Sequence, residues 1–206
     1  QNYIREGHYQ TLSAYHGRDT RDNVFNPRRG TFNAVNVDST GGFLVGPDAF
    51  TKYRLTLRKY QSVNSRGVIA GRITGGTINL SKGTLPLYEE YGVGGKGAGV
   101  VDEGVGGVYT IRGYEWREFI GKKMLVGNLE YRHKMHKNFE GYLFYDFGDA
   151  WGSDSLTSTN AASNYKIKKG YGVGFNFITP IGPIRIDYGK GEDRTGKAYF
   201  SMDRMF

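Results

Sequence analysis

The sequence of 206 residues contains no cysteine, only five prolines and only four histidines. Without cysteine the chain can form neither a disulfide framework nor a thiolate metal site. The histidines lack the spacing typical of metal ligands, so we expect no metal and no other cofactor. They also form no convincing pair with a serine nucleophile, and we therefore expect no enzyme. The four histidines are His8, His16, His133 and His136.

Long hydrophobic runs are also missing from the sequence. No stretch approaches the roughly 18 to 20 consecutive apolar residues of a transmembrane helix, and mean hydropathy is −0.54. Glycine, by contrast, accounts for 32 residues, and aromatic side chains make up 15% of the chain. This composition is unusual for a compact soluble core and suits a sheet with one apolar and one polar face.

The formal net charge of +8 indicates an anionic partner. The basic residues are spread over the polar positions and the turns. They form no stripe with interleaved exposed aromatic residues, as a nucleic-acid surface would. We therefore expect contacts with the anionic headgroups of membrane lipids and none with nucleic acid.

Alternation with a period of two residues dominates the sequence, and helical periodicity is nearly absent. Between Lys52 and Arg58, apolar residues occupy the odd positions and charged or polar residues occupy the even positions. The same pattern predicts strands over residues 69–74, 125–132, 141–151, 171–177, 184–188 and 198–206, and weaker ones over 8–21 and 31–38. Short turns at residues 25–30, 64–67 and 179–183 contrast with long irregular segments over 82–123 and 153–170.

Short turns at one end of a sheet and long loops at the other are typical of outer-membrane barrels. In such a barrel the apolar face turns outward to lipid and the polar face lines the lumen. A soluble sandwich or lipocalin-like barrel shows the same alternation with its apolar face inward, so alternation leaves both open. The aromatic residue that ends the chain and the abundance of Tyr and Phe favour the membrane. We predict an all-β fold, an antiparallel transmembrane β-barrel of about eight strands.

Two short motifs resemble those of a known family. The long Gly-rich segment contains Ile111-Arg112-Gly113-Tyr114, and a later strand contains Phe144, Asp146 and Gly148 at alternate positions. This resembles the BamA/TamA superfamily of outer-membrane protein assembly factors and two-partner secretion transporters. The family's hallmarks are a [V/I]-R-G-[F/Y] loop tip and an F-x-D-x-G strand motif. The turn at 25–30, the segment 179–188 and the closing strand match in the same order.

The resemblance implies that the long loop folds into the barrel lumen, where Arg112 contacts the strand motif of Phe144, Asp146 and Gly148. Two-residue spacing does place Phe144 and Asp146 on one, polar, face. From the residues alone, a solvated Arg112 and an ordinary lumen Asp146 remain the alternative. With the motif, Arg112→Ala is expected to cost about 1 to 3 kcal/mol by leaving Asp146 unpaired.

The resemblance also implies a function, which is to assist insertion or translocation of unfolded proteins at the bacterial outer membrane. Substrate strands would pair at a weakly closed seam formed by the terminal strand, which carries Phe200, Met202 and Phe206. The alternative is a passive channel. The polar face carries five arginines that would favour anions, namely Arg54, Arg58, Arg72, Arg132 and Arg185.

The chain departs from the family in length. It resembles the C-terminal half of a sixteen-stranded family barrel, and we predict a single barrel domain over residues 1–206 without a POTRA domain. The alternation predicts about nine strand segments, whereas bacterial barrels have an even number of strands. An even count therefore requires one more strand from residues 1–10, one strand fewer, or a second chain. We expect a homodimer that associates through the edge at residues 198–206.

Overall fold

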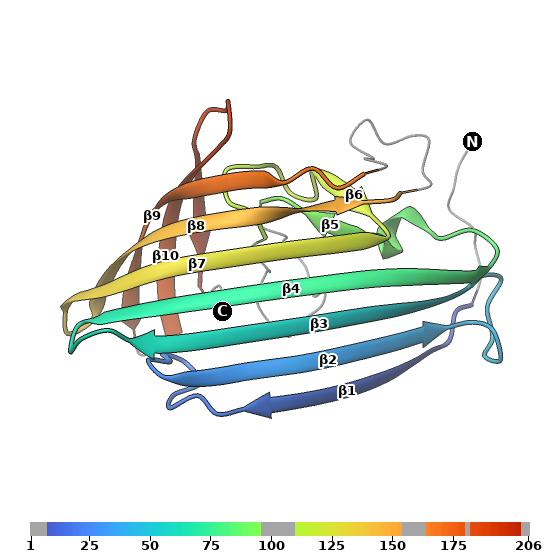
Figure 1. Cartoon of the computed structure of the whole chain (residues 1–206), viewed down its shortest axis with the longest axis horizontal. Helices are drawn as coiled ribbons and strands as arrows, with labels where there is room; N and C mark the ends of the chain where they lie inside the picture. The colour runs from blue at the N-terminus through green and yellow to red at the C-terminus, as the bar shows by residue number, and fades with distance from the viewer. Residues whose placement is uncertain (1–7, 96–109, 154–163, 180–181, 203–206) are drawn as a thin grey trace.

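The computed structural model describes residues 8–95, 110–153, 164–179 and 182–202. Nine strands in these ranges form one antiparallel sheet, in which each strand lies next to its neighbour along the chain except where β7 follows β4 (Figure 1). The strands are β1 (Thr11–Asp19), β2 (Gly30–Thr40), β3 (Ala49–Ser62), β4 (Gly67–Lys82), β7 (Lys123–His136), β8 (Phe139–Trp151), β9 (Lys168–Thr179), β10 (Gly182–Gly191) and β11 (Lys197–Ser201). The predicted antiparallel all-β architecture is confirmed.

The segment between β4 and β7 contains a second, smaller sheet. Its two strands, β5 (Tyr91–Val93) and β6 (Phe119–Gly121), pair antiparallel, and the short 3-10 helix η1 (Leu87–Glu89) precedes them. The sequence predicted an irregular segment here, because strands of three residues are too short to display alternation. Within the described ranges, no helix is long and apolar enough to cross a membrane.

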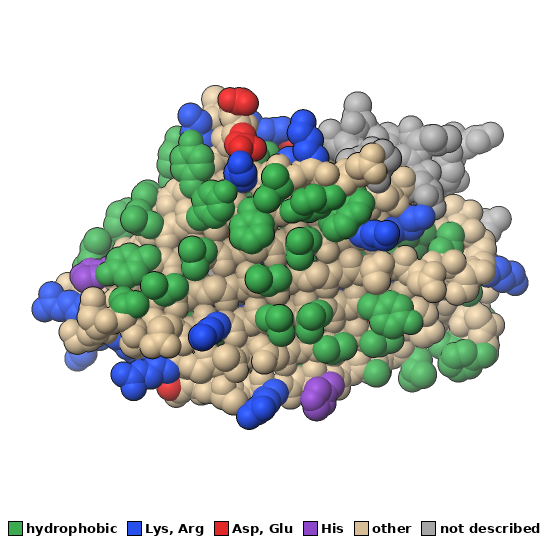
Figure 2. All heavy atoms as spheres, viewed as in Figure 1, with side chains coloured by type: hydrophobic (Ala, Val, Ile, Leu, Met, Phe, Trp, Pro, Cys, Tyr) green, Lys and Arg blue, Asp and Glu red, His purple; other side chains and the backbone are tan. Residues whose placement is uncertain are grey.

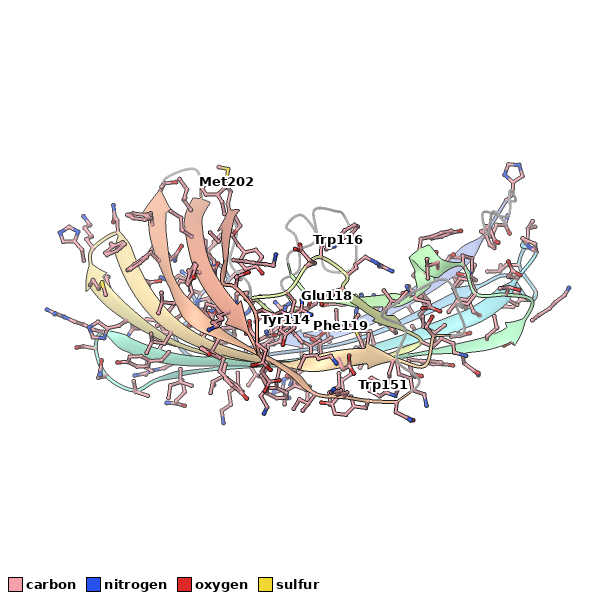
Figure 3. All side chains as sticks on the ribbon, turned by 90° about the horizontal axis from the view of Figure 1, so that it is seen from above. Tyr114, Trp116, Glu118, Phe119, Trp151 and Met202 are labelled. Atoms are coloured by element: carbon pink, nitrogen blue, oxygen red, sulfur yellow. The ribbon has the colours of Figure 1, made fainter. Side chains whose placement is uncertain are left out.

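The large sheet differs from the prediction in strand number and closure. It has nine strands instead of about eight, and in the described residues β1 and β11 each pair with one neighbour only. Seen from above, the sheet curves into an open trough (Figure 3). In the described residues the edge strands β1 and β11 do not pair with each other.

The two faces of the sheet carry different side chains. Apolar residues of the central strands lie exposed on the convex face, for example Leu55 at 45% and Leu143 at 60% exposure. Figure 2 shows such side chains spread over this face. Polar residues such as Thr56, Asn128 and Asp146 are buried on the concave face. The apolar face therefore turns outward, as in a membrane barrel, and the soluble alternative with an inward apolar face is wrong.

The core lies in the trough, beneath the segment that joins β4 to β7. This segment contributes apolar side chains that pack against the concave sides of the strands. The buried cluster comprises Phe50, Ile78, Leu85, Tyr91, Val93, Ile111, Tyr114, Phe119, Met124, Val126 and Ala150. The labelled Tyr114 and Phe119 lie on the concave side of the sheet in Figure 3. The trough is thus partly filled by a docked loop.

The turns at the two ends of the strands differ in length, as predicted. At one end, residues 63–66 and 137–138 join neighbouring strands tightly, whereas at the other end residues 83–122 separate β4 from β7. The short turns are also tied to one another, because the Arg28 guanidinium donates hydrogen bonds to Asn64 O at 3.0 Å and to Ser65 O at 2.9 Å. The sheet therefore has one compact rim and one elaborate rim.

Candidate functional site: a buried arginine at the tip of the docked loop

Arg112 lies at the tip of the loop and has no exposed surface. The following residue, Gly113, has a φ of +97°, a conformation that favours glycine, and a Cβ at Gly113 would lie 2.3 Å from the backbone N of Gly191. The chain can therefore reverse at this point in close contact with β10. The reversal directs the Arg112 side chain down into the trough.

Three carboxylates from three different strands surround the Arg112 guanidinium. Nε and one terminal nitrogen each donate to Asp146 of β8 at 2.7 Å, in the two-pronged geometry that suits an arginine and a carboxylate. The other terminal nitrogen donates to Glu130 of β7 and Asp187 of β10, both at 2.9 Å. The Arg112 backbone N–H also donates to Asp146, at 3.0 Å. One side chain thus joins the loop to β7, β8 and β10.

An aromatic ring completes the surroundings of Arg112. The guanidinium carbon lies 3.4 Å from the centroid of the Phe144 ring, a cation–π arrangement inside a desolvated site. Phe144 and Asp146 stand two residues apart on the concave face of β8 and contact the same guanidinium from two directions. The structure therefore brings together Arg112, Phe144 and Asp146 from the two motifs.

Two further buried arginines balance the negative charge of this site. Arg185 donates to Glu130 at 2.6 Å and to Asp187 at 2.8 Å, and Arg132 donates to Glu130 at 2.8 Å. Three arginines and three carboxylates thus form one network from which water is largely excluded. Buried ions are stable only when they are paired and hydrogen-bonded in this way, and removal of one member leaves the others uncompensated. The Tyr142 hydroxyl adds a hydrogen bond to Asp187 at 2.8 Å.

Asn128 of β7 connects this network to the loop backbone. Its side-chain amide donates to Thr110 O at 2.7 Å and to Asp146 at 2.9 Å, and its oxygen accepts from Arg72 Nε at 2.9 Å. The alternation in the sequence predicted that Asn128 lies on the polar face of its strand, but it predicted no contact for this side chain. Its position shows that the loop is held by backbone contacts as well as by Arg112.

The floor beneath the loop tip is made of glycine. A Cβ at Gly170 of β9 would lie 2.0 Å from Arg112 O, and a Cβ at Gly189 of β10 would lie 2.9 Å from the Arg112 Cβ. Both contacts are closer than real Cβ atoms allow, so the loop fits only because side chains are missing there. We call Gly170 and Gly189 the glycine floor.

The other predicted site residues occupy different surroundings. Ile111 is buried in the core cluster, and Tyr114 packs edge-on against Phe119 in that cluster. Gly148 lies against β7, since a Cβ there would be 2.3 Å from Leu125 O, and so its nearest neighbours are outside the loop.

The terminal strand differs from the prediction in its described residues. Phe200 and Met202 are exposed, at 61% and 57%, and Met202 follows the end of β11. The predicted strand over residues 198–206 is thus replaced by Lys197–Ser201 as far as the structure describes it, and Phe206 lies outside the described residues.

The sequence missed Glu130 and Asp187 as partners of Arg112. A signal was present, because each acid stands two residues from an arginine on the polar face of its strand, in Glu130-x-Arg132 and Arg185-x-Asp187. Such pairs mark charges that share one buried surface. The pairing also corrects the predicted lumen charge, since Arg132 and Arg185 are neutralised by carboxylates and do not form an anion-attracting wall. Among the described residues, no group of three or more acidic or histidine side chains is arranged to hold a metal ion.

An antiparallel sheet with an apolar convex face and a loop docked in its polar trough defines the class of outer-membrane barrel proteins. The sequence matches the Omp85 superfamily domain over residues 4–206, and the chain belongs to this superfamily. Among solved structures, the fold is similar to that of BamA from Haemophilus ducreyi lacking POTRA domains 1–3. The TM-score is 0.70 and the identity 17%, over 93% of this chain and 40% of that one.

Two plant proteins are similar in sequence. Outer envelope protein 39, chloroplastic, from Arabidopsis thaliana is 28% identical over 162 residues, which cover 73% of this chain and 40% of that protein. Outer envelope protein 80, chloroplastic, from the same plant is 30% identical over 103 residues, covering 48% of this chain and 14% of that protein. The chain therefore spans less than half the length of these relatives. Because they carry the name of the chloroplast envelope, the bacterial location stays a prediction.

Proposed function

We propose that this chain forms part of an outer-membrane barrel that assists the insertion or translocation of other proteins. Superfamily membership supports the class of function. The observation that carries the proposal is the docked loop. Its Arg112 is held by carboxylates of β7, β8 and β10, which fixes a large insert inside a sheet whose convex face suits lipid.

The chemistry of the substrate follows from the edge of the sheet. β11 has one strand neighbour in the described residues and lies at the edge of the sheet, where an extended chain can add through backbone hydrogen bonds. Unpaired backbone groups are costly in lipid, and an unfolded outer-membrane protein supplies strands that satisfy them. The proposed substrate is therefore an unfolded β-barrel protein that adds a strand to β11. Phe200 faces outward on this strand, where it would contact lipid.

The proposed location is an outer membrane, of a bacterium as the sequence motifs suggest. The apolar residues of the convex face would contact lipid tails, and basic residues at the compact rim, such as Arg66 and Lys137, would contact anionic headgroups. A passive channel finds less support, because the lumen arginines of β7 and β10 are paired with acids.

We further propose that a closed barrel forms from two copies of this chain, each a single barrel domain. Counted over the described residues, two nine-stranded sheets give an even total of eighteen strands. In an antiparallel sheet of nine strands, the first and last run in the same direction, so two copies with one orientation in the membrane meet through parallel edges. Parallel pairing is slightly less stable per residue. Native mass spectrometry of the detergent-solubilised protein tests this proposal, and a particle containing one chain would contradict it.

Assembly activity is tested by reconstitution. The chain is placed in phosphatidylcholine vesicles, urea-unfolded substrate barrel is added, and its folding is followed by heat-modifiable migration on gels. We expect faster folding than with empty vesicles, loss of the gain with Arg112→Ala, and no loss with the matched control Arg18→Ala on exposed β1. Equal folding rates with and without the protein, together with an anion-selective conductance, would favour the channel instead.

A further inference from the structure

The edge strand β11 is the shortest strand of the large sheet and is held weakly by the sheet itself. In the described residues it is five residues long and pairs with β10, in the register Tyr199 opposite Asp187. Asp187 is one of the acids that hold Arg112. Because directly opposed residues share a face, the Tyr199 side chain points into the trough toward the docked loop.

Tyr199 makes two hydrogen bonds to the backbone of the loop tip. Its hydroxyl accepts from Gly113 N at 2.8 Å and donates to Tyr114 O at 3.0 Å. Its ring also packs against the small buried cluster of Tyr60 and Ala70, from β3 and β4. One side chain of the edge strand thus contacts the residues that directly follow Arg112.

Residues near Tyr199 also connect β11 and the turn before it to the docked loop, at the elaborate rim. Lys197 of β11 forms an ion pair with Glu115 of the loop. Arg194, in the turn before β11, pairs with Glu118 at 2.6 Å and lies 4.9 Å from the centroid of the Tyr114 ring. These ion pairs are partly exposed and weak individually. The Tyr199 hydroxyl, whose two hydrogen bonds are partly buried, is therefore the main element of the connection.

We propose that Tyr199 is a positioning residue that couples the docked state of the loop to the order of the edge strand β11. When Arg112 occupies its network, Gly113 and Tyr114 lie where the Tyr199 hydroxyl binds both, and β11 is fixed from inside the trough. When the loop leaves, β11 loses these contacts and keeps its ladder to β10 and the packing of the Tyr199 ring against Tyr60 and Ala70. The loop then controls how readily the edge opens to a substrate strand, and this last step rests on the proposed assembly function.

Hydrogen–deuterium exchange of the full chain in detergent micelles tests the coupling without any substrate. Tyr199→Phe keeps the ring and removes only the hydroxyl. We expect amide exchange in residues 197–201 and at Gly113 to accelerate roughly tenfold, as expected for two lost hydrogen bonds. Exchange in β3 and β7 should stay unchanged. The matched control Tyr145→Phe, on the outer face of β8, should leave every segment unchanged.

A double variant distinguishes coupling from a general loosening. Arg112→Lys cannot reproduce the two-pronged contact with Asp146, so it should release the loop and accelerate exchange in β11. In the Tyr199→Phe background it should add little, because the connection is already broken. Equal acceleration by Arg112→Lys in both backgrounds would overturn the proposal, as would wild-type exchange of β11 in Tyr199→Phe.

A second variant covers the case in which Tyr199→Phe does not fold. Glu115→Gln removes the exposed partner of Lys197 and should accelerate exchange in β11 about twofold, and no acceleration there would count against the connection. The folding rate of an added substrate barrel is measured separately. If exchange shows the coupling and the substrate does not fold faster, the coupling stands and the assembly function fails.

Discussion

The strands β1–β4 and the strands β7–β11 use the same alternation for different purposes. In β7–β11 the concave face is covered by the loop, and its arginines Arg132 and Arg185 are 4% and 2% exposed within the carboxylate network. In β3, by contrast, Arg54 and Arg58 are only half-buried. Alternation places arginines inward in both regions. Arg132 and Arg185 are buried where carboxylates pair with them, whereas Arg72 of β4 is buried where Asn128 accepts its hydrogen bond.

The outer faces of the two regions differ as well. Leu143, Tyr145 and Phe147 turn outward on β8. On β1 the register with β2 and β3 places His16 and Arg18 on the same outer side, and every residue of β1 is exposed. Charged side chains are costly against hydrocarbon. β1 is therefore poorly suited to lipid and better suited to a neighbouring protein edge.

The largest expected effect is that of Arg112→Ala on the network in β7–β11. The variant leaves Asp146, Glu130 and Asp187 without their shared cation, and breaking a buried ion pair costs about 3 to 5 kcal/mol. This exceeds the cost expected from Asp146 alone, because three acids are affected. We expect a lower heat-modification temperature and protease-sensitive loop residues. Unchanged values in both assays would mean that the network is not a stabilising centre.

A matched pair of substitutions tests the difference between the outer faces. Leu143→Arg on β8 and Ala14→Arg on β1 each place a charge outward near the middle of a strand. We expect Leu143→Arg to cost about 2 to 4 kcal/mol in a lipid bilayer and Ala14→Arg less than about 1 kcal/mol. Unfolding by urea in vesicles measures both. Equal costs would contradict the assignment of β1 to a non-lipid environment.

The glycine floor predicts a smaller, local effect. Gly170→Ala places a methyl group against Arg112 O and should lift the loop tip at a cost of about 1 to 3 kcal/mol. Gly71→Ala on β4 is the control, because the nearest atom to a Cβ there is 4.0 Å away. The measurements are thermal stability and proteolysis of the loop. Similar behaviour of the two variants would show that the close approach to β9 is relaxed without cost.

The smallest expected effect lies in the turn between β1 and β2. Slight burial raises the pKa of the Asp22 carboxyl, but N–H groups of Arg28 and Arg29, at 2.9 and 3.1 Å, outweigh it and hold the pKa below its ordinary value. The stability from these bonds is therefore present above the ordinary value of 3.8 and lost as pH falls through the lowered pKa.

Amide protection of Arg28 and Arg29, corrected for intrinsic exchange, should fall on acidification to this range. In Asp22→Asn the protection should not depend on pH. Protection that falls in the same way in both proteins would assign the effect to another group.

The sequence predicts the strands well and the site only in part. Strand β3 can be recognised in the sequence because one of its faces is apolar and the other polar along the strand. This difference appears directly as alternation of apolar and polar residues. Strands β5 and β6 were missed since three residues record no period, and their positions depend on packing of Tyr91 and Phe119 in the core.

The contact of Arg112 with Asp146 was expected from the two motifs, whereas its contacts with Glu130 and Asp187 were not. Which inward acids meet a given arginine depends on the stagger and curvature of the sheet. The sequence of a single strand predicts neither the stagger nor the curvature of the sheet. The same reason explains why the sequence did not predict a role for Tyr199, since the curl of β9–β11 brings it to Gly113.

The separations along the chain between Arg112 and its acids determine when the loop can dock during folding. Glu130, Asp146 and Asp187 follow Arg112 by 18, 34 and 75 residues. Contacts of such long range form slowly, because much chain must be ordered before they contribute. The full set of carboxylates exists only after β7, β8 and β10 have assembled. Docking of Arg112 is therefore a late event, and the loop enters a trough that has already been built.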